Sequence, residues 1–227
     1  MPALTFECIE KGAEKSRSVA VSQLVVAGWT GRDRAAVEHH IQELAALGVP
    51  PPRTAPEFYH LGAGLVTLDD AIDVVGEESS GEVEAVLLKL DDGFWVGVGS
   101  DHTDRGLERA GIAMAKQVCP KPVAGTLWRY DDVKRHWDDL VAQSSVFEAG
   151  RWVAYQDGRL IGLLPPDSLV EKYASTDQDL TPGTLMFCGT QSVIGNIRHF
   201  PRFRMTLVDP VLNRSISREY TVNSLPT

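Results

Sequence analysis

The stretch GEVEAVLLKLDDGFWVGVGSDHTDR, from Gly81 to Arg105, decides the fold of this chain. Two apolar, β-prone runs flank Asp91-Asp92-Gly93, an arrangement typical of a β-hairpin with a tight turn. Glu82 and Glu84 stand two residues apart, so on a strand both carboxylates point from the same face. Asp101 follows the second strand where the apolar alternation stops. The hairpin therefore predicts three carboxylates at one end of two paired strands.

Carboxylates held this close repel one another unless a cation neutralises them. Carboxylate oxygens are the preferred ligands of hard divalent cations such as Mg2+, Mn2+ and Ca2+. We therefore predict a metal site formed by Glu82, Glu84 and Asp101. The alternative is a solvated strand face that carries two glutamates, followed by an aspartate in a turn.

Length and composition limit the possible functions. A chain of 227 residues with 43% hydrophobic and 23% charged residues is typical of one globular domain. The formal net charge of −9 argues against a general nucleic-acid surface or an anionic-membrane surface. The three cysteines are scattered, which argues against a disulfide framework and a cysteine zinc site. With no apparent leader and no apolar run long enough to span a bilayer, we expect a cytoplasmic protein without a membrane partner.

Strands outnumber helices along the rest of the chain. Hairpins are predicted from strands at 4–9 with 18–26, 152–155 with 160–164, and 202–209 with 214–222, and a single strand at 184–188. Helices are predicted at 34–47, 131–145 and 167–174. The pattern indicates an α+β fold around a strongly bent sheet or sandwich, with a few peripheral helices. We expect a single domain over 1–227, with an N-terminal hairpin (1–30), a lid helix and loop (31–60) and a metal-binding core (81–222).

The predicted lid helix carries a possible acid–base pair. His40 flanks the apolar stripe centred on Ile41 and Leu44, whereas His39 lies on the polar side. His40 and Glu43 are three residues apart, so the carboxylate can orient the imidazole and raise its basicity. The alternative is an ordinary surface helix with two histidines and an ion-pairing glutamate.

These motifs together resemble the fumarylacetoacetate hydrolase superfamily. The family's E-x-E strand and later aspartate match Glu82, Glu84 and Asp101, and its N-D-x-[ST]-x-R pattern is similar to Ser100-Asp101-His102-Thr103-Asp104-Arg105. Further similarities, in the order of the family, are a lysine before a proline-containing strand (Lys116), an L-x-P-G…T-G-T motif (Leu180 to Thr190), and an H-x-x-E pair after Gly-Arg (His40 and Glu43 after Gly31-Arg32).

The sequence also departs from the family pattern. The interval from Glu84 to Asp101 is shorter than usual, Gln191 replaces a proline, and Glu108 stands where many members have glutamine. The spacing from Gly31 to His40 is longer by a few residues. These departures indicate a divergent branch of the superfamily.

The resemblance implies a fumarylacetoacetate-hydrolase-like mixed β-sandwich or roll and a set of roles for the matched residues. It implies a homodimeric, magnesium-dependent (or Mn2+- or Ca2+-dependent) hydrolase that cleaves a C–C bond in a 2-oxo acid of the acylpyruvate or fumarylpyruvate type. In that reading, His40 and Glu43 activate water, Lys116 stabilises negative charge, and Arg32, Arg105 and Thr190 bind substrate. The alternatives are a lyase or isomerase (decarboxylase, dehydratase or tautomerase) on a related 2-oxo acid, and a metal-binding member without catalysis.

Some residues have competing interpretations. Arg105 can either contact substrate or hold a carboxylate that binds the metal. The alternative for Lys116 is an ordinary surface lysine, and the alternative for Thr190 is a residue that caps a turn. Cys119 and Cys188 fit buried apolar positions better than nucleophiles, and we do not expect His102 to be a metal ligand. If the substrate is a dianion, Arg32, Arg105 and Lys116 must gather near the metal.

Overall fold

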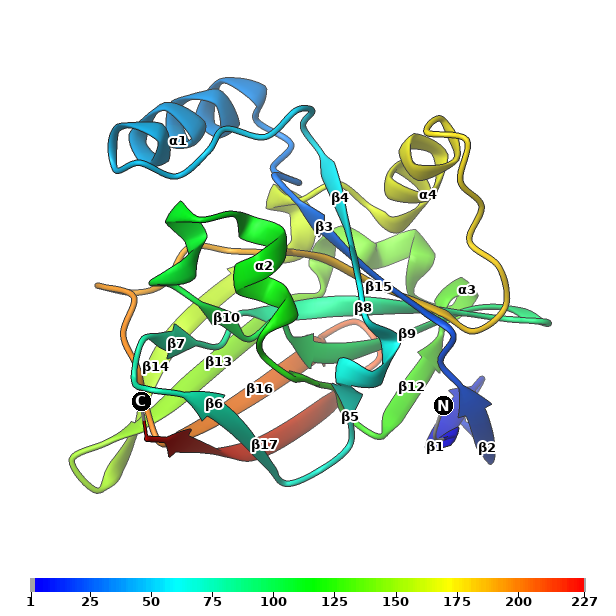
Figure 1. Ribbon diagram of the computed structural model, residues 1–227. Helices are drawn as coiled ribbons and strands as arrows, with labels where there is room; N and C mark the ends of the chain where they lie inside the picture. The colour runs from blue at the N-terminus through cyan, green and yellow to red at the C-terminus, as the bar shows by residue number, and fades with distance from the viewer. Residues whose placement is uncertain (1–2, 227) are drawn as a thin grey trace.

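The computed structural model describes residues 3–226, which form two large β-sheets with short helices at their periphery (Figure 1). The first sheet has eight strands, in the spatial order β2 (Ala13–Ala20), β1 (Ala3–Glu10), β12 (Thr126–Arg129), β9 (Gly93–Ser100), β8 (Val83–Leu90), β15 (Thr184–Thr190), β3 (Gln23–Gly28) and β4 (Glu57–Leu61). The second has five strands, in the order β14 (Arg151–Arg159), β13 (Val141–Glu148), β16 (Arg202–Asp209), β17 (Arg214–Leu225) and β6 (Ala71–Val75).

The remaining elements are short. Two small strand pairs join β10 (Thr103–Asp104) to β7 (Ser79–Ser80) and β11 (Lys121–Pro122) to β5 (Val66–Thr67). The α-helices are α1 (Arg34–Ala46), α2 (Ile112–Gln117), α3 (Tyr130–Val133) and α4 (Pro166–Ala174). The 3-10 helices are η1 (Ala63–Leu65), η2 (Leu107–Arg109), η3 (Lys134–Asp139) and η4 (Leu160–Gly162). Within residues 3–226, no helix combines the length and the apolar character needed to cross a membrane. The predicted α+β class is confirmed.

Strand β8 runs through the centre of the molecule and is covered on both faces. Val83, Ala85 and Leu87 belong to the core cluster that also contains residues of the five-stranded sheet. Val86 and Leu88 belong to a second cluster on the other face of the eight-stranded sheet. Because successive strand residues alternate between faces, Glu82 and Glu84 share the second face with Val86 and Leu88.

The predicted hairpin of β8 and β9 is confirmed. The strands pair antiparallel from Val83 opposite Ser100 to Leu90 opposite Gly93, which leaves Asp91 and Asp92 as the turn. Beyond the open end of the hairpin, the backbone N–H of Asp101 donates to the carbonyl of Glu82 over 2.9 Å. This hydrogen bond extends the pairing by one step and brings the acidic residues of the two strands together.

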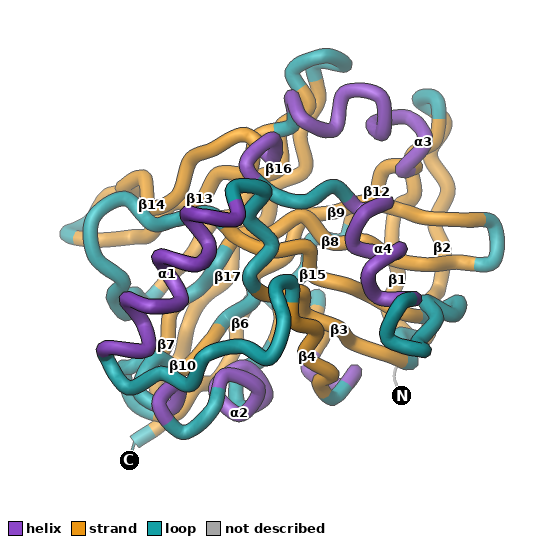
Figure 2. The backbone as a smooth tube through the Cα atoms, turned by 90° about the horizontal axis from the view of Figure 1, so that it is seen from above, coloured by secondary structure: helices purple, strands orange, loops and turns teal. Residues whose placement is uncertain are grey.

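The predicted lid helix is also present, as α1. Asp33 caps its N-terminus, accepting hydrogen bonds from the backbone N–H groups of Ala35 and Ala36. None of its residues is buried, and Figures 1 and 2 show the helix at the periphery, joined to the sheet through β3 and the segment that leads to β4. Its apolar stripe is therefore only partly covered in the free protein.

Two predicted hairpins and one predicted helix were wrong in their boundaries or type. The N-terminal hairpin turns at Lys11-Gly12, and the polar segment 13–17, predicted as a turn, lies in exposed strand β2. The predicted strand 18–26 is split between β2 and β3. Edge strands expose one or both faces, so β2 lacks the apolar alternation from which strands are recognised.

The other two errors adjoin each other in β13 and β14. The predicted helix 131–145 is a short α-helix and a 3-10 helix that end at Asp139, after which strand β13 begins at Val141. The predicted turn 156–159 lies inside strand β14, and the true hairpin turn is at Ala149-Gly150. Ser144 is polar but buried in β13, where its hydroxyl donates a hydrogen bond to Gln156. It therefore interrupts the alternation of apolar and polar residues from which a strand is recognised.

Candidate metal centre

The three predicted carboxylate ligands converge at the open end of the β8–β9 hairpin. Glu82, Glu84 and Asp101 each offer a carboxylate oxygen, and these three atoms lie within 4.8 Å of one another. Glu84 and Asp101 are buried, with exposed fractions of 3% and 0%, whereas Glu82 is half-buried. The cluster therefore combines two desolvated carboxylates with one at the edge of solvent.

Glu84 is buried, and within the described residues it forms no direct ion pair. Its Oε2 accepts a hydrogen bond from the backbone N–H of Gly189 over 2.6 Å. Burial, followed by the charge of Asp101, raises the pKa of the Glu84 carboxyl well above its ordinary value. Gly189 has a φ of +101°, and a Cβ at this position would overlap the side chain of Thr30, so only glycine brings this N–H to Glu84.

Asp101 lies between two lysines. Lys116 makes a close ion pair with its Oδ2, and the Nζ of Lys121 lies 3.3 Å from its Oδ1. The fully buried Lys121 directs its protons at the backbone carbonyls of His102, Lys116 and Cys119, so Oδ1 is left without a well-directed hydrogen-bond donor. Burial would raise the pKa of Asp101, but the two lysines outweigh it and hold this pKa below its usual value.

Arg105 and Lys116 hold Glu82 from the other side. The Nη2 of Arg105 lies 3.1 Å from Oε1 of Glu82, and its Nη1 donates to Oε1 of Glu108 over 2.9 Å. The Nζ of Lys116 lies 3.6 Å from Oε2 of Glu82. Burial lowers the pKa of Lys116, but Asp101 and Glu82 more than offset it, so its pKa is raised and the ammonium stays protonated.

The residues present fit a hard divalent cation. All three converging donors are carboxylates, which suits Mg2+, Mn2+ or Ca2+ and does not suit a metal that requires sulfur. Oδ1 of Asp101 is a buried acceptor without a hydrogen bond, and the raised pKa of Glu84 reflects repulsion and desolvation that a bound cation would relieve. The donor set does not distinguish among these three ions.

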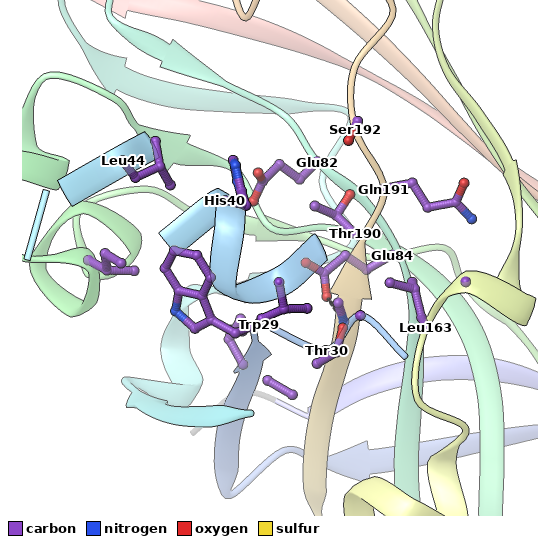
Figure 3. Close-up of a pocket in the computed structure, with 18 of the residues that line it drawn as sticks. Trp29, Thr30, His40, Leu44, Glu82, Glu84, Leu163, Thr190, Gln191 and Ser192 are labelled. Carbon is purple, nitrogen blue, oxygen red and sulfur yellow. Dashed lines mark hydrogen bonds between the residues drawn. The ribbon is translucent and has the colours of Figure 1, made fainter. Parts of the chain in front are cut away.

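Glu82 and Glu84 of the cluster line a pocket of about 630 Å³, whereas Asp101 is fully buried and does not line it. Figure 3 shows His40 on α1 projecting into this pocket, with Glu82, Glu84 and Thr190 coming from the strands on the other side. His40 is 61% exposed, its Nδ1 lies 3.5 Å from Oε2 of Glu43, and its ring lies 5.8 Å from that of Trp29. Glu43 does not line the pocket itself, so it can act only through the histidine.

The structure brings most of the predicted site residues to this pocket. The lining includes His40, Glu82, Glu84, Arg105, Lys116 and Thr190. Both sides of the Thr190 hydroxyl are engaged, because it donates to the carbonyl of Val83 over 2.9 Å and accepts from the amide of Gln156 over 2.8 Å. The hydroxyl therefore fixes the strand that carries Gly189.

The placement of Arg32 beside the metal was wrong. Its side chain does not line the pocket; it forms an ion pair with Asp138, with Nη1 3.0 Å from Oδ2, and donates from Nε to the carbonyl of Leu163 over 2.6 Å. Asp138 is 106 residues away in sequence, so local sequence spacing cannot reveal this partner. The predicted gathering of basic groups is therefore limited to Arg105 and Lys116.

One structural feature of the site was missed from the sequence. Lys121 was not recognised as a buried counterion, because a lysine between two prolines is ordinarily a surface residue. His102 is buried with both ring nitrogens engaged, 2.9 Å from the hydroxyls of Tyr220 and Ser79, so it is not available as a metal ligand, as expected. Burial, Lys121 and Arg105 hold the pKa of His102 well below its ordinary value.

Comparison with protein families gives one match over most of the chain. The model of DUF2848, described as a protein of unknown function, matches residues 27–220. No curated protein shows significant sequence similarity to the chain.

Solved structures resemble this fold at low sequence identity. Fumarylpyruvate hydrolase from Pseudomonas aeruginosa, in complex with Mn2+ and pyruvate, gives a TM-score of 0.62 at 17% identity, covering 99% of this chain and 98% of that chain. A 2-keto-3-deoxyarabinonate dehydratase gives 0.67 at 15% identity, covering 93% of this chain and 78% of that chain. The yeast protein ynq8, of the fumarylacetoacetate hydrolase family, gives 0.65 at 17% identity, covering 92% and 95%.

These relatives have different reactions in their names but share one architecture, so the expected fold is confirmed while the reaction stays open. The chain belongs to the DUF2848 family of proteins of unknown function and has the fold of the fumarylacetoacetate hydrolase family.

Proposed function

We propose that the protein is a divalent-metal-dependent hydrolase that cleaves a C–C bond in a 2-oxo acid of the acylpyruvate type. The main support is the convergence of Glu82, Glu84 and Asp101 within 4.8 Å, with Glu82 and Glu84 lining a pocket. Lys116 and His40 line the same pocket. A bound Mg2+, Mn2+ or Ca2+ ion would supply Lewis acidity and a template for the oxygens of the 2-oxo acid.

His40 is the proposed general base. Its contact with Glu43 orients the imidazole and favours the uptake of a proton from water. The hydroxide formed adds to the distal carbonyl carbon of the substrate, and the C–C bond to the pyruvate unit then breaks. The electron pair of that bond passes to the pyruvate unit as an enolate, whose carbon is finally protonated.

Lys116 is the proposed stabiliser of this enolate. Its ammonium stays protonated beside the carboxylates and is pocket-lining, so it presents positive charge where the negative charge develops. Arg105 has a positioning role, because its guanidinium is already paired with Glu82 and Glu108. Glu84 and Asp101 are held in place by Gly189 and by the two buried lysines.

A lyase or isomerase acting on a related 2-oxo acid is the second candidate. Both His40 and Glu43 are more than half exposed on a helix with no buried residues, so the hydrolytic base is the least fixed part of the site. The fold is shared with a protein named as a dehydratase. A metal-binding protein without catalysis is the third candidate.

Three further expectations belong to the proposal. A homodimer is implied by the family resemblance, and light scattering on the purified chain tests it. A cytoplasmic location suits three free, buried cysteines, which a reducing compartment keeps unpaired. The net charge of −9 also favours a small-molecule substrate over a nucleic-acid partner.

The test incubates the protein with a panel of acylpyruvates, fumarylpyruvate, oxaloacetate and a 3-deoxy-2-oxo sugar acid. Each reaction is run with Mg2+, with Mn2+ and with EDTA, and the products are identified. Pyruvate plus a carboxylic acid supports the hydrolase, whereas loss of CO2 or water supports the second candidate. Turnover that persists in EDTA would refute the metal-dependent mechanism, and metal binding without any turnover would favour the third candidate.

The base assignment has a matched control on the same helix. His39 also lies 3.5 Å from Glu43, but it does not line the pocket. We expect His40→Ala to lower kcat by about 10²-fold or more, as for loss of a general base, and His39→Ala to change it by less than about threefold. Equal effects of the two substitutions would contradict the assignment.

A further inference from the structure

The pocket wall opposite the carboxylates is apolar. Ala36, Val37 and Leu44 of α1 line it beside His40, and none of them is buried in the free protein. Apolar side chains from other segments complete this wall: Trp29, Val49, Ile112, Leu163 and Ile197. A ligand that carried an apolar group between the helix and this wall would remove both surfaces from water.

The cationic side chains that line the pocket are all engaged with protein carboxylates. Arg105 is paired with Glu82 and Glu108, and Lys116 with Asp101 and Glu82. Arg159 makes a close ion pair with Asp139. In the described lining, Arg105, Lys116 and Arg159 therefore each already have a carboxylate partner, and only the pair of Arg159 with Asp139 is about half exposed.

Two further carboxylates of the lining, those of Asp33 and Asp157, disfavour an anion. The N-terminus of α1 faces the pocket through Asp33, whose carboxylate already accepts the N–H groups of Ala35 and Ala36. Asp157 adds another carboxylate to the lining. An anionic group at the far end of a substrate would meet like charge without a free counterion.

We propose that this pocket selects 2-oxo acids whose distal group is uncharged and apolar, and discriminates against those that end in a second carboxylate. The inference rests on the proposed action on 2-oxo acids and narrows its substrate class. The head group meets the metal centre, while the tail meets Val37, Leu44 and the apolar wall. The proposal thus disfavours dicarboxylates such as fumarylpyruvate as the preferred substrate.

A binding experiment tests this independently of turnover. The full chain is loaded with Mn2+, and the affinities of 2-oxohexanoate and 2-oxoadipate are measured by calorimetry. The two acids have the same main chain and differ in a terminal methyl group or carboxylate. We expect 2-oxohexanoate to bind at least about tenfold more tightly, a difference of about 1.4 kcal/mol. Equal affinities, or tighter binding of 2-oxoadipate, would overturn the inference.

A variant with a new cation in the pocket provides the second arm. Leu44→Arg places a guanidinium on the apolar wall, and we expect it to shift the ratio of the two affinities toward 2-oxoadipate by about tenfold or more. Leu47→Arg is the matched control, because Leu47 is the C-cap residue of the same helix, is 63% exposed and does not line the pocket. An unchanged ratio in Leu44→Arg would overturn the proposed position of the tail.

The failure of this inference is distinguishable from failure of the proposed function. If 2-oxoadipate is preferred while acylpyruvates are hydrolysed, only the tail assignment is wrong. If neither 2-oxo acid binds the Mn2+-loaded protein, the proposed action on 2-oxo acids is refuted, and the inference falls with it.

Discussion

When no metal is bound, Asp101→Asn should lower the free energy of unfolding, whereas Glu84→Gln should leave it nearly unchanged or raise it. Asp101 is the counterion of Lys121, which is fully buried, and of Lys116, which is nearly so. Removing one partner of a buried ion pair destabilises a protein by about 3–5 kcal/mol, because the remaining charge stays buried without compensation. For a chain of this length, that loss corresponds to a decrease in Tm of roughly 6–20 °C.

Glu84→Gln should behave differently. The amide oxygen of glutamine can still accept the hydrogen bond from Gly189, and the substitution removes a buried charge close to two other carboxylates. We expect the free energy of unfolding to stay within about 1 kcal/mol of wild type, or to rise.

The assay is urea unfolding in EDTA, with Glu171→Gln as the control. Glu171 is exposed on α4, far from the pocket lining, so its amide should change stability by less than about 0.5 kcal/mol. In Mn2+ at about one hundred times the dissociation constant, wild type should gain about 2.7 kcal/mol, and both ligand variants should lose this gain. Equal losses for Asp101→Asn and Glu84→Gln in EDTA would refute the distinct electrostatic roles assigned to the two carboxylates.

Three further outcomes are expected. The pKa of Glu84 is raised above its ordinary 4.5 in the folded protein, so its contribution to stability is present at low pH and is lost as pH rises through the folded value. In EDTA, the stability of Glu84→Gln relative to wild type should therefore increase with pH in urea titrations, and a constant difference would contradict the raised pKa. Gly189→Ala should lower the free energy of unfolding by more than about 2 kcal/mol, because alanine is strained at a φ of +101° and its Cβ overlaps Thr30; a smaller loss would contradict the close packing. The thiols of Cys8, Cys119 and Cys188 should react with a disulfide reagent only after denaturation, because burial raises the pKa of each, to about 11 for Cys119. Rapid reaction of any of them in the native protein would contradict this.

The acidic cluster and the central hairpin could be predicted because both depend on local pattern. Alternation along one strand is enough to place Glu82 and Glu84 on the same face, and a tight turn brings Asp101 back to them. The lid helix was likewise predictable from a capping aspartate and a helical apolar period. The helix ended within one residue of the predicted boundary.

Errors arose where long-range contacts override local pattern. Val133, Trp137 and Leu140 are all buried and have helical spacing, yet the chain changes to a strand directly after them. Pairing with β14, the next strand along the chain, and with the sequence-distant β16 stabilises that strand, and the helical spacing of the preceding residues does not reveal it. Tertiary pairing also decides the role of Arg32, whose carboxylate partner is distant along the chain.

Lys116 and Lys121 lie beside the same acidic cluster but have different surroundings. Lys116 contacts two of the three ligand carboxylates, and Lys121 lies within 3.3 Å of Asp101. In the metal-free protein these ammonium groups are the counterions that allow buried acids to stay ionised. Under the proposed function, a divalent cation at the same oxygens would compete with Lys116 for them and would leave its charge available to a 2-oxo acid. Lys121 has no such freedom, because three backbone carbonyls surround it and solvent does not reach it. The two lysines therefore differ in kind: Lys116 lines the pocket and could pair with a substrate carboxylate under the proposed function, whereas Lys121 is enclosed and fixes Asp101.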